Sequence, residues 1–234
     1  MNNLRFVWRT LILVAIIFVC ANLAEAQAPR TWVSGVGDDA NPCSRTAPCK
    51  TFAGAISKTA KGGEINCLDG GGFGSVVITK SITIDGSGAM SGVIGAQSFG
   101  IIINIADTAA DAGVVRIRGL TLNGAGTGTT GIRISAAKRV SIENTVIDGF
   151  TDGIVAASAG NSLVFVKDSS IRNNLGNGIS AASAGSQIAL SNVSVIFNTT
   201  GLATSNSGKI ISFKNNAIFG NGTDGEPTST VALR

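Results

Sequence analysis

The sequence contains no histidine and no tyrosine, and only 14% of its 234 residues are charged. Histidine is the side chain that proteins use most often for proton transfer near neutral pH, and it is also a common zinc ligand. The cysteines lack the second close pair that a zinc site built from thiolates needs. We therefore expect no metal centre of this kind.

Basic residues exceed acidic residues only slightly, 18 to 14, and they are scattered along the chain. Lys138-Arg139 is the only adjacent basic pair beyond the N-terminal region. Proteins that bind nucleic acids usually gather such residues along one face. We therefore expect no nucleic-acid partner.

The long apolar run at the N-terminus, residues 11–20, has the features of a signal peptide. Two arginines precede the run, and Ala24-Glu25-Ala26 follows it as a cleavage site with small residues. The run is about half of the roughly 20 residues that a membrane-spanning helix needs. We predict a signal peptide over 1–26, a secreted or periplasmic mature chain, and no membrane span after cleavage.

Three cysteines remain in the predicted mature chain. Cys43 and Cys49 flank a short segment that contains proline, so we expect a disulfide between them, as suits an oxidising compartment. Cys67 is then unpaired. It stands in an alternating apolar stretch, where we prefer the interpretation of a small buried thiol.

The strongest signal is a repeat of about 24 residues. The apolar-polar pattern of residues 141–149 returns at 165–173, at 189–195 and at 212–218. A second anchor, glycine followed by isoleucine or leucine, recurs in step with the first at Gly131, Gly153, Gly178 and Gly201. Only short strand-like runs lie between the anchors, so each period predicts one coil of strands.

One such coil cannot bury its own apolar side, but parallel coils stacked about 4.8 Å apart pair every strand with a copy of itself. The sequence therefore predicts an all-β fold, a single-stranded right-handed parallel β-helix. Two inward ladders are expected, Ile142, Val166, Leu190, Phe213 and Ile147, Ile171, Val195, Ile218. Asn and Asp tolerate left-handed backbone, which predicts a structural turn column of Asn144, Asp168, Asn192, Asn215.

The repeat is looser upstream, where Ile101–Ile105 predicts a further rung and 106–112 an exposed loop. Residues 51–60 predict an amphipathic helix that covers the open end of the first coil. Its apolar face is expected to hold Phe52, Ala55, Ile56 and Ala60. We divide the chain into the signal peptide, an N-terminal segment with the capping helix at 27–63, the β-helix at 64–221, and a C-terminal tail or cap at 222–234.

Several stretches of the sequence resemble the pectin-lyase-like superfamily of right-handed parallel β-helices. Lys50-Thr51-Phe52, Gly62-Gly63-Glu64-Ile65 and Ser81-Ile82-Thr83-Ile84-Asp85-Gly86 are similar to its capping helix, Gly-Gly turn and first coil. Trp32-Val33-Ser34 and the Pro42-Cys43 to Pro48-Cys49 segment resemble small secreted bacterial members. The resemblance spans about residues 31–221. It implies the fold, whereas the superfamily's activities range from lyases and hydrolases to adhesins.

The residues that the superfamily uses for catalysis are mostly missing. Polygalacturonase-like members carry Gly-His-Gly and Arg-x-Lys, and this chain has neither. Pectate-lyase-like members hold calcium with several acidic side chains and use an arginine as the base. Asp148, Asp152 and Arg172 are the candidates for such a catalytic set, and calcium is expected as a cofactor only in that case.

The best candidate binding set places Asn123, Asp148 and Arg172 in one column on consecutive coils, with polar side chains in the neighbouring turns. These additional side chains are Asp152, Asn173, Asn174 and Asn177. Such a set could bind a cation or an acidic sugar. We prefer the simpler interpretation that Asp148 and Arg172 form an exposed pair across two strands.

Three phenylalanines, Phe150, Phe197 and Phe219, would stack on sugars if they point outward, but we expect them in the core. We predict an exported, non-catalytic monomer that acts as a surface, adhesion or glycan-contact module. Its expected partner is a polysaccharide or cell-surface glycan. The alternative is a carbohydrate-active enzyme such as a pectate-lyase-like polysaccharide lyase.

Overall fold

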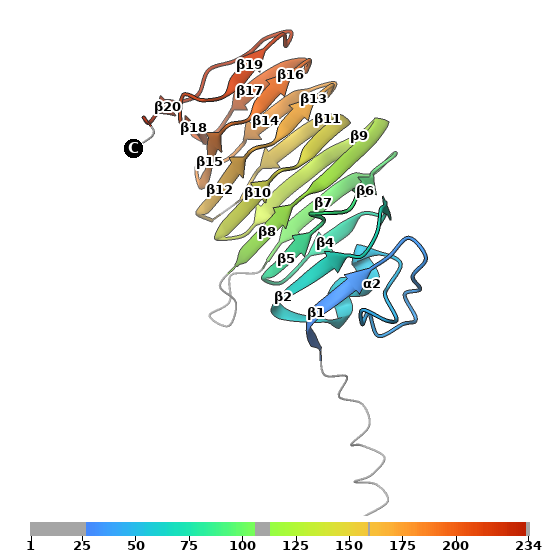
Figure 1. Cartoon of the computed structure of the whole chain (residues 1–234). Helices are drawn as coiled ribbons and strands as arrows, with labels where there is room; N and C mark the ends of the chain where they lie inside the picture. Colours follow the sequence, from blue (N-terminus) through green and yellow to red (C-terminus); the bar gives the residue numbers. More distant parts are fainter. Residues whose placement is uncertain (1–26, 106–112, 159, 233–234) are drawn as a thin grey trace, which may run out of the picture.

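The computed structural model describes residues 27–105, 113–158 and 160–232. In this part the chain winds into stacked coils of parallel strands, with one short helix at the N-terminal end (Figure 1). The predicted all-β parallel β-helix is confirmed. The predicted signal peptide and the predicted loop at 106–112 lie outside the described residues.

We call the first sheet face one. Within the described residues its nine strands follow one another in chain order, one strand from each layer of the stack. They are β1 (Ala28–Val33), β2 (Thr59–Cys67), β5 (Ile82–Asp85), β8 (Val114–Arg118), β10 (Arg139–Glu143), β12 (Ser162–Lys167), β15 (Ser186–Ser191), β18 (Lys209–Ser212) and β20 (Ser229–Thr230).

The second sheet bends within the two long strands β9 (Leu120–Ala136) and β11 (Val146–Ala156), which gives two further faces. Face two holds β3 (Gly71–Gly72), β6 (Ser91–Ile94), the first part of β9 and of β11, β13 (Ser170–Arg172), β16 (Ser194–Ile196) and β19 (Ala217–Phe219). Face three holds β4 (Val76–Ile78), β7 (Phe99–Asn104), the second part of β9 and of β11, β14 (Asn177–Ala181) and β17 (Thr200–Thr204).

Like residues lie above like in the interior, as the repeat predicted. On face two the strand register pairs Ile147 with Ile171, Ile171 with Val195, and Val195 with Ile218. The glycine anchors also stack, because Ile132, Ile154, Ile179 and Leu202 occupy matching positions on face three. The predicted rung at Ile101–Ile105 is confirmed as well, since Ile101 pairs with Ile132.

The first predicted ladder is wrong at its last member. Ile142, Val166 and Leu190 pair in order on face one, but Leu190 then pairs with Ser212 instead of Phe213. A shift of one residue turns a side chain to the other side of a strand. Phe213 lies just past the end of β18 and packs edge-on against Phe165, with ring centroids 6.2 Å apart.

The same shift moves the turn column. Asn144, Asp168 and Asn192 have the predicted left-handed backbone, with φ of 47°, 49° and 53°. The amide of Asn192 donates a hydrogen bond of 2.7 Å to Asp168 Oδ1. The fourth left-handed residue is Lys214, φ 65°, and not Asn215 as predicted.

Close packing of successive coils explains why glycine stands at the anchor positions. A Cβ atom on Gly131 would lie 2.7 Å from the carbonyl oxygen of Gly153, and one on Gly178 would lie 2.9 Å from that of Gly201. Such distances are shorter than van der Waals contact, so the backbones of successive coils approach too closely at this corner for a side chain.

The N-terminal cap is a short helix, α2 (Phe52–Lys58), whose N-cap residue Thr51 accepts a hydrogen bond from the Gly54 amide. The predicted helix over 51–60 is too long, because Thr59 has extended backbone and begins β2. Ala60 is therefore a strand residue and does not belong to the helix face. Phe52 and Ala55 are buried as expected, and Phe52 packs against Phe73.

The predicted disulfide between Cys43 and Cys49 is confirmed. Cys67 is free, but it is partly exposed and not fully buried as we preferred, since it stands at the last position of β2. Loss of solvent around the thiol raises the pKa of Cys67 to about 11, and the charges of Asp85 and Asp69 act in the same direction.

Candidate functional site

The predicted column on consecutive coils exists, and it continues further than expected. The strand register places Asn123 beside Asp148 and Asp148 beside Arg172. The same register then leads to Ile196 and Phe219. We call this row of five outward positions the outer column of face two.

Asp148 and Arg172 form an ion pair in the middle of the outer column. Arg172 Nε lies 2.8 Å from Asp148 Oδ2, and both side chains are partly exposed. The amide of Asn173 donates a hydrogen bond of 3.1 Å to the other carboxylate oxygen. Both oxygens of Asp148 therefore already have a partner within the protein.

Asp152 and Asn177 form a second polar pair, at the corner that leads to face three. The backbone N–H and the side-chain amide of Asn177 donate to Asp152 Oδ1 at 2.8 and 3.0 Å. These bonds join successive coils, so the pair also holds the corner in place.

Asn174 is the predicted binding residue that a ligand cannot reach, because only 2% of it is exposed. Its side-chain oxygen accepts from the Phe150 amide, and its amide donates to Asn198 Oδ1 at 2.8 Å. Asn198 donates in turn to Asn221, which donates to Asp224 Oδ1 at 2.8 Å. Asn174 thus belongs to an internal asparagine ladder that Asp224 terminates.

These residues do not fit a calcium site. Calcium takes six to eight oxygen ligands, usually including several carboxylates. Both oxygens of the Asp148 carboxylate accept from Arg172 and Asn173, and Oδ1 of Asp152 accepts two hydrogen bonds from Asn177. Among the described residues no group of three or more His, Cys, Asp or Glu side chains is placed to hold a metal ion.

The three candidate phenylalanines separate into one core residue and two surface residues. Phe150 is fully buried, as expected. The core interpretation is wrong for Phe197 and Phe219, which are 61% and 74% exposed. Phe219 follows the inward Ile218 in β19, so strand alternation would have placed it outside.

Phe197 stands at the corner after the outer column and has left-handed backbone, φ 59°. The matching corner positions on neighbouring coils are Asn173 and Gly220, and the Phe197 ring lies over Gly220. Leu175, on the coil before Phe197, is also exposed. We call Phe197 and Phe219 the aromatic patch.

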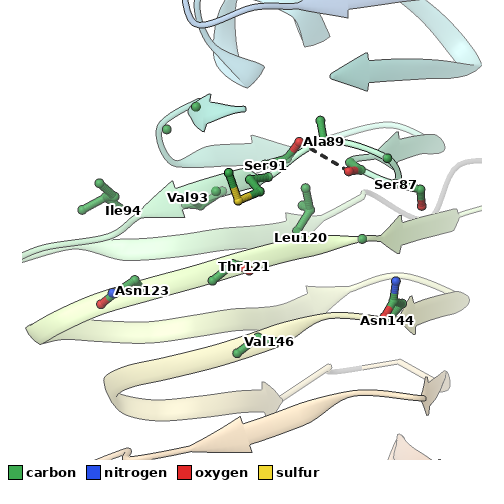
Figure 2. A pocket seen from close by; sticks show the side chains of 17 residues that line it. Ser87, Ala89, Ser91, Val93, Ile94, Leu120, Thr121, Asn123, Asn144 and Val146 are labelled. Carbon is green, nitrogen blue, oxygen red and sulfur yellow. Dashed lines mark hydrogen bonds between the residues drawn. The ribbon is translucent and has the colours of Figure 1, made fainter. Parts of the chain in front are cut away.

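We did not predict from the sequence the groove of about 620 Å³ that lies on face two. Its floor consists of outward positions on three successive strands, Gly92, Thr121 and Val146. Figure 2 shows Ser87 and Asn144 at one end of this face-two groove and Ile94 and Asn123 at the other. The density of glycines in residues 70–95 was the signal that could have revealed it.

A smaller hollow of about 380 Å³ lies on face one, where Arg116 and Arg139 stand beside Leu163 and Phe165. Among the described residues neither arginine has an ion-pair partner. The basic residues of this hollow and the nearly neutral face two give the solenoid two chemically different sides.

Comparison with known proteins identifies the fold but no close relative. The family described as right handed beta helix region matches residues 69–227. No curated protein and no solved structure matches the chain. Among the described residues no helix is long and apolar enough to cross a membrane.

Proposed function

We propose that this chain, which belongs to the right-handed β-helix family, is an exported, non-catalytic protein that contacts glycans through face two. The outer column is the observation that carries the proposal. It runs from hydrogen-bonding side chains at Asn123, Asp148 and Arg172, past Ile196, to the exposed ring of Phe219.

Sugars match this combination because they present both apolar C–H faces and many hydroxyl groups. Aromatic rings bury the apolar faces, and amide, carboxylate and guanidinium groups bind the hydroxyls. Coils about 4.8 Å apart place Asp148 and Phe219 about 14 Å from each other along the axis. A chain of several sugar units would therefore lie along the solenoid and contact both.

The state of the carboxylates supports binding without catalysis. Glycoside hydrolysis needs two carboxyl groups that face each other across the bond. Asp148 is paired with Arg172 and Asn173, and Asp152 accepts two hydrogen bonds from Asn177. These bonds tie the two candidate acids to the neighbouring coil.

Two features support export. The N-terminal sequence has the arrangement of a signal peptide, and the Cys43–Cys49 disulfide is of the kind that persists in oxidising compartments. The partner on this proposal is a polysaccharide or cell-surface glycan outside the cytoplasm. The protein would act there as a monomer, since one chain carries the whole column.

The test is retention of the exported full chain on a panel of insoluble polysaccharides. We expect the wild type to be retained by at least one of them and the double variant Phe197→Ala/Phe219→Ala to be released. Leu163→Ala, which removes an exposed apolar side chain from face one, is the matched control. Failure of the wild type to bind any glycan would overturn the proposal.

A parallel assay addresses catalysis. The wild type is incubated with uronate polymers and calcium, and the products are examined for unsaturated ends. We expect none. Release of unsaturated oligosaccharides would replace the non-catalytic function with that of a polysaccharide lyase.

A further inference from the structure

The face-two groove is hollow because two of its outward positions carry no large side chain. Gly72 and Gly92 stand on neighbouring strands, and the matching positions on the later coils carry threonine, valine, serine or alanine. The neighbouring apolar side chains are unusually exposed, Met90 at 92% and Ile94 at 63%. The fold itself does not need these two side chains, because neither is packed into the core.

The polar groups of the groove are available to a ligand. Among the described residues, no hydrogen bond uses the Thr121 hydroxyl or the Asn144 side chain. The oxygen of Asn123 accepts from the Ala125 amide at 2.7 Å, which leaves its NH₂ group free to donate. Hydroxyl and amide groups are therefore distributed over an otherwise apolar surface.

All 17 lining residues of the groove are uncharged. A volume of about 620 Å³ is within the range of sites that hold small organic molecules. An anionic ligand placed here would lose its hydration without gaining a cationic partner, which is costly. The composition of the groove thus favours a neutral ligand with hydroxyl groups and apolar faces.

We propose that the face-two groove binds an uncharged sugar unit of a neutral polysaccharide. This inference rests on the proposed function and names its ligand class. It also assigns a site on the N-terminal coils, separate from the aromatic patch on the C-terminal coils.

The rest of face two agrees with a neutral ligand. Its strands carry two charged residues, Asp148 and Arg172, and these neutralise each other. Asn123 belongs both to the groove and to the outer column, so a chain leaving the groove passes over the column. Four coil steps of about 4.8 Å separate Asn123 from Phe219, which is about 19 Å.

Gly92→Phe is the variant that fills the groove. A Cβ atom on Gly92 would lie 3.4 Å from the Thr121 carbonyl oxygen and 3.6 Å from that of Gly71, which are ordinary contacts. The ring would then occupy the floor without disturbing the core. Val77→Phe is the matched control, since Val77 is an exposed strand residue on face three of the same coil region.

A second variant, Ile94→Asp, places a charge at the groove's edge, with Leu163→Asp on face one as its control. Thermal unfolding and gel filtration establish that each variant is folded. Gly92→Phe acts by filling the groove, whereas Ile94→Asp acts by adding a charge at its edge. The test therefore remains informative if one of the two variants does not fold.

Binding is measured by calorimetry with neutral glucan and chitin oligosaccharides and with oligogalacturonate. We expect the neutral ligands to bind, with affinity lowered about tenfold or more by Gly92→Phe and Ile94→Asp and unchanged in both controls. Preferential binding of oligogalacturonate would overturn the inference. An unchanged affinity in the groove variants would also overturn it.

The outcomes separate this inference from the proposed function. If Phe197→Ala/Phe219→Ala releases the glycan while the groove variants do not, the glycan-contact function stands and the groove assignment fails. If the wild type binds no glycan, both fail. If the protein binds the anionic oligogalacturonate and Arg116→Ser abolishes this binding, the ligand site lies in the hollow on face one.

Discussion

Arg172 and Asp148 stand one above the other on adjacent coils of face two, with Nε and Oδ2 2.8 Å apart. The spacing of the repeat places their backbones in register, and the guanidinium then reaches one coil back to the carboxylate. The pair is partly exposed, and that exposure determines how much it stabilises the fold.

Replacing Asp148 with Asn should therefore lower the free energy of unfolding only slightly, by about 0.2–1 kcal/mol, because water screens an exposed ion pair. Urea denaturation of the single variants and of Asp148→Asn/Arg172→Gln, as a double-mutant cycle, measures the coupling. Added salt should reduce it. A coupling of several kcal/mol would show that the pair is far less screened than its exposure indicates.

Asn198→Ala should be much more costly. Asn198 is 3% exposed, and its side-chain oxygen accepts from the backbone N–H of Asn174 at 3.1 Å and from the Asn174 side-chain amide at 2.8 Å, so its removal leaves both of these buried donors without an acceptor. Unsatisfied buried polar groups cost about 1–3 kcal/mol each. Urea denaturation measures the loss, with Asn104→Ala in β7 as an exposed asparagine control. Equal stability of the two variants would contradict a structural role for the ladder.

Gly153→Ala should destabilise the stack, since the added methyl carbon would lie 2.6 Å from Cγ2 of Ile171 and would also meet the Gly178 carbonyl. Overpacking of this kind costs about 1–3 kcal/mol. Gly160→Ala has open space around the new methyl group and serves as the control. The midpoint of thermal unfolding should fall for the first variant alone.

Acid should weaken the N-terminal cap through Asp39. Burial alone would raise the pKa of Asp39, but hydrogen bonds from Thr51 and Lys50 and the charge of Lys58 outweigh it and lower the pKa below 3.8. The ionised form is therefore favoured by folding. Its contribution is present above pH 3.8 and is lost as the pH falls through the lowered value.

The comparison of Asp39→Asn with the wild type over an acid titration measures this contribution. The variant should unfold with a weaker dependence on pH in that range. Glu226→Gln, which changes an exposed carboxylate near the C-terminus, should keep the wild-type dependence. An Asp39→Asn profile parallel to that of the wild type would place the acid sensitivity elsewhere.

The thiol of Cys67 should react slowly in the folded protein. Its pKa of about 11 leaves little thiolate near neutral pH, and thiolate is the reactive form. Because the folded pKa exceeds the ordinary 9.0, stability falls as the pH rises from 9.0 toward 11. Alkylation kinetics in native buffer and in urea test this, with Cys67→Ser as the blank. Equal rates in the two solvents would contradict it.

Much of the fold could be predicted because its determinants are local and periodic. A repeat of about 24 residues specifies which side chains of one coil lie above those of the next, and alternation within each strand specifies which of them face inward. The ladder from Ile147 to Ile218, the glycine anchors and the pairing of Asp148 with Arg172 all follow from these two rules.

The errors arose where a single residue changed the register. In the last coil, β18 pairs Ser212 with Leu190, so Phe213 left the core and Lys214 replaced Asn215 in the turn column. Apolar character alone suggested the wrong alignment there. Phe197 was misplaced for a similar reason, because its left-handed corner position turns the ring outward.

The sequence by itself determined the period, the parallel stacking, the disulfide and the candidate column, since each depends on spacing along the chain. Only the tertiary structure decided that Asn174 is internal, that Phe197 and Phe219 are exposed, and that glycines open a groove on face two. These properties depend on what neighbouring coils place around a residue. The solvent exposure of a side chain depends on the side chains that neighbouring coils place around it, and the residue spacing within one coil does not specify these.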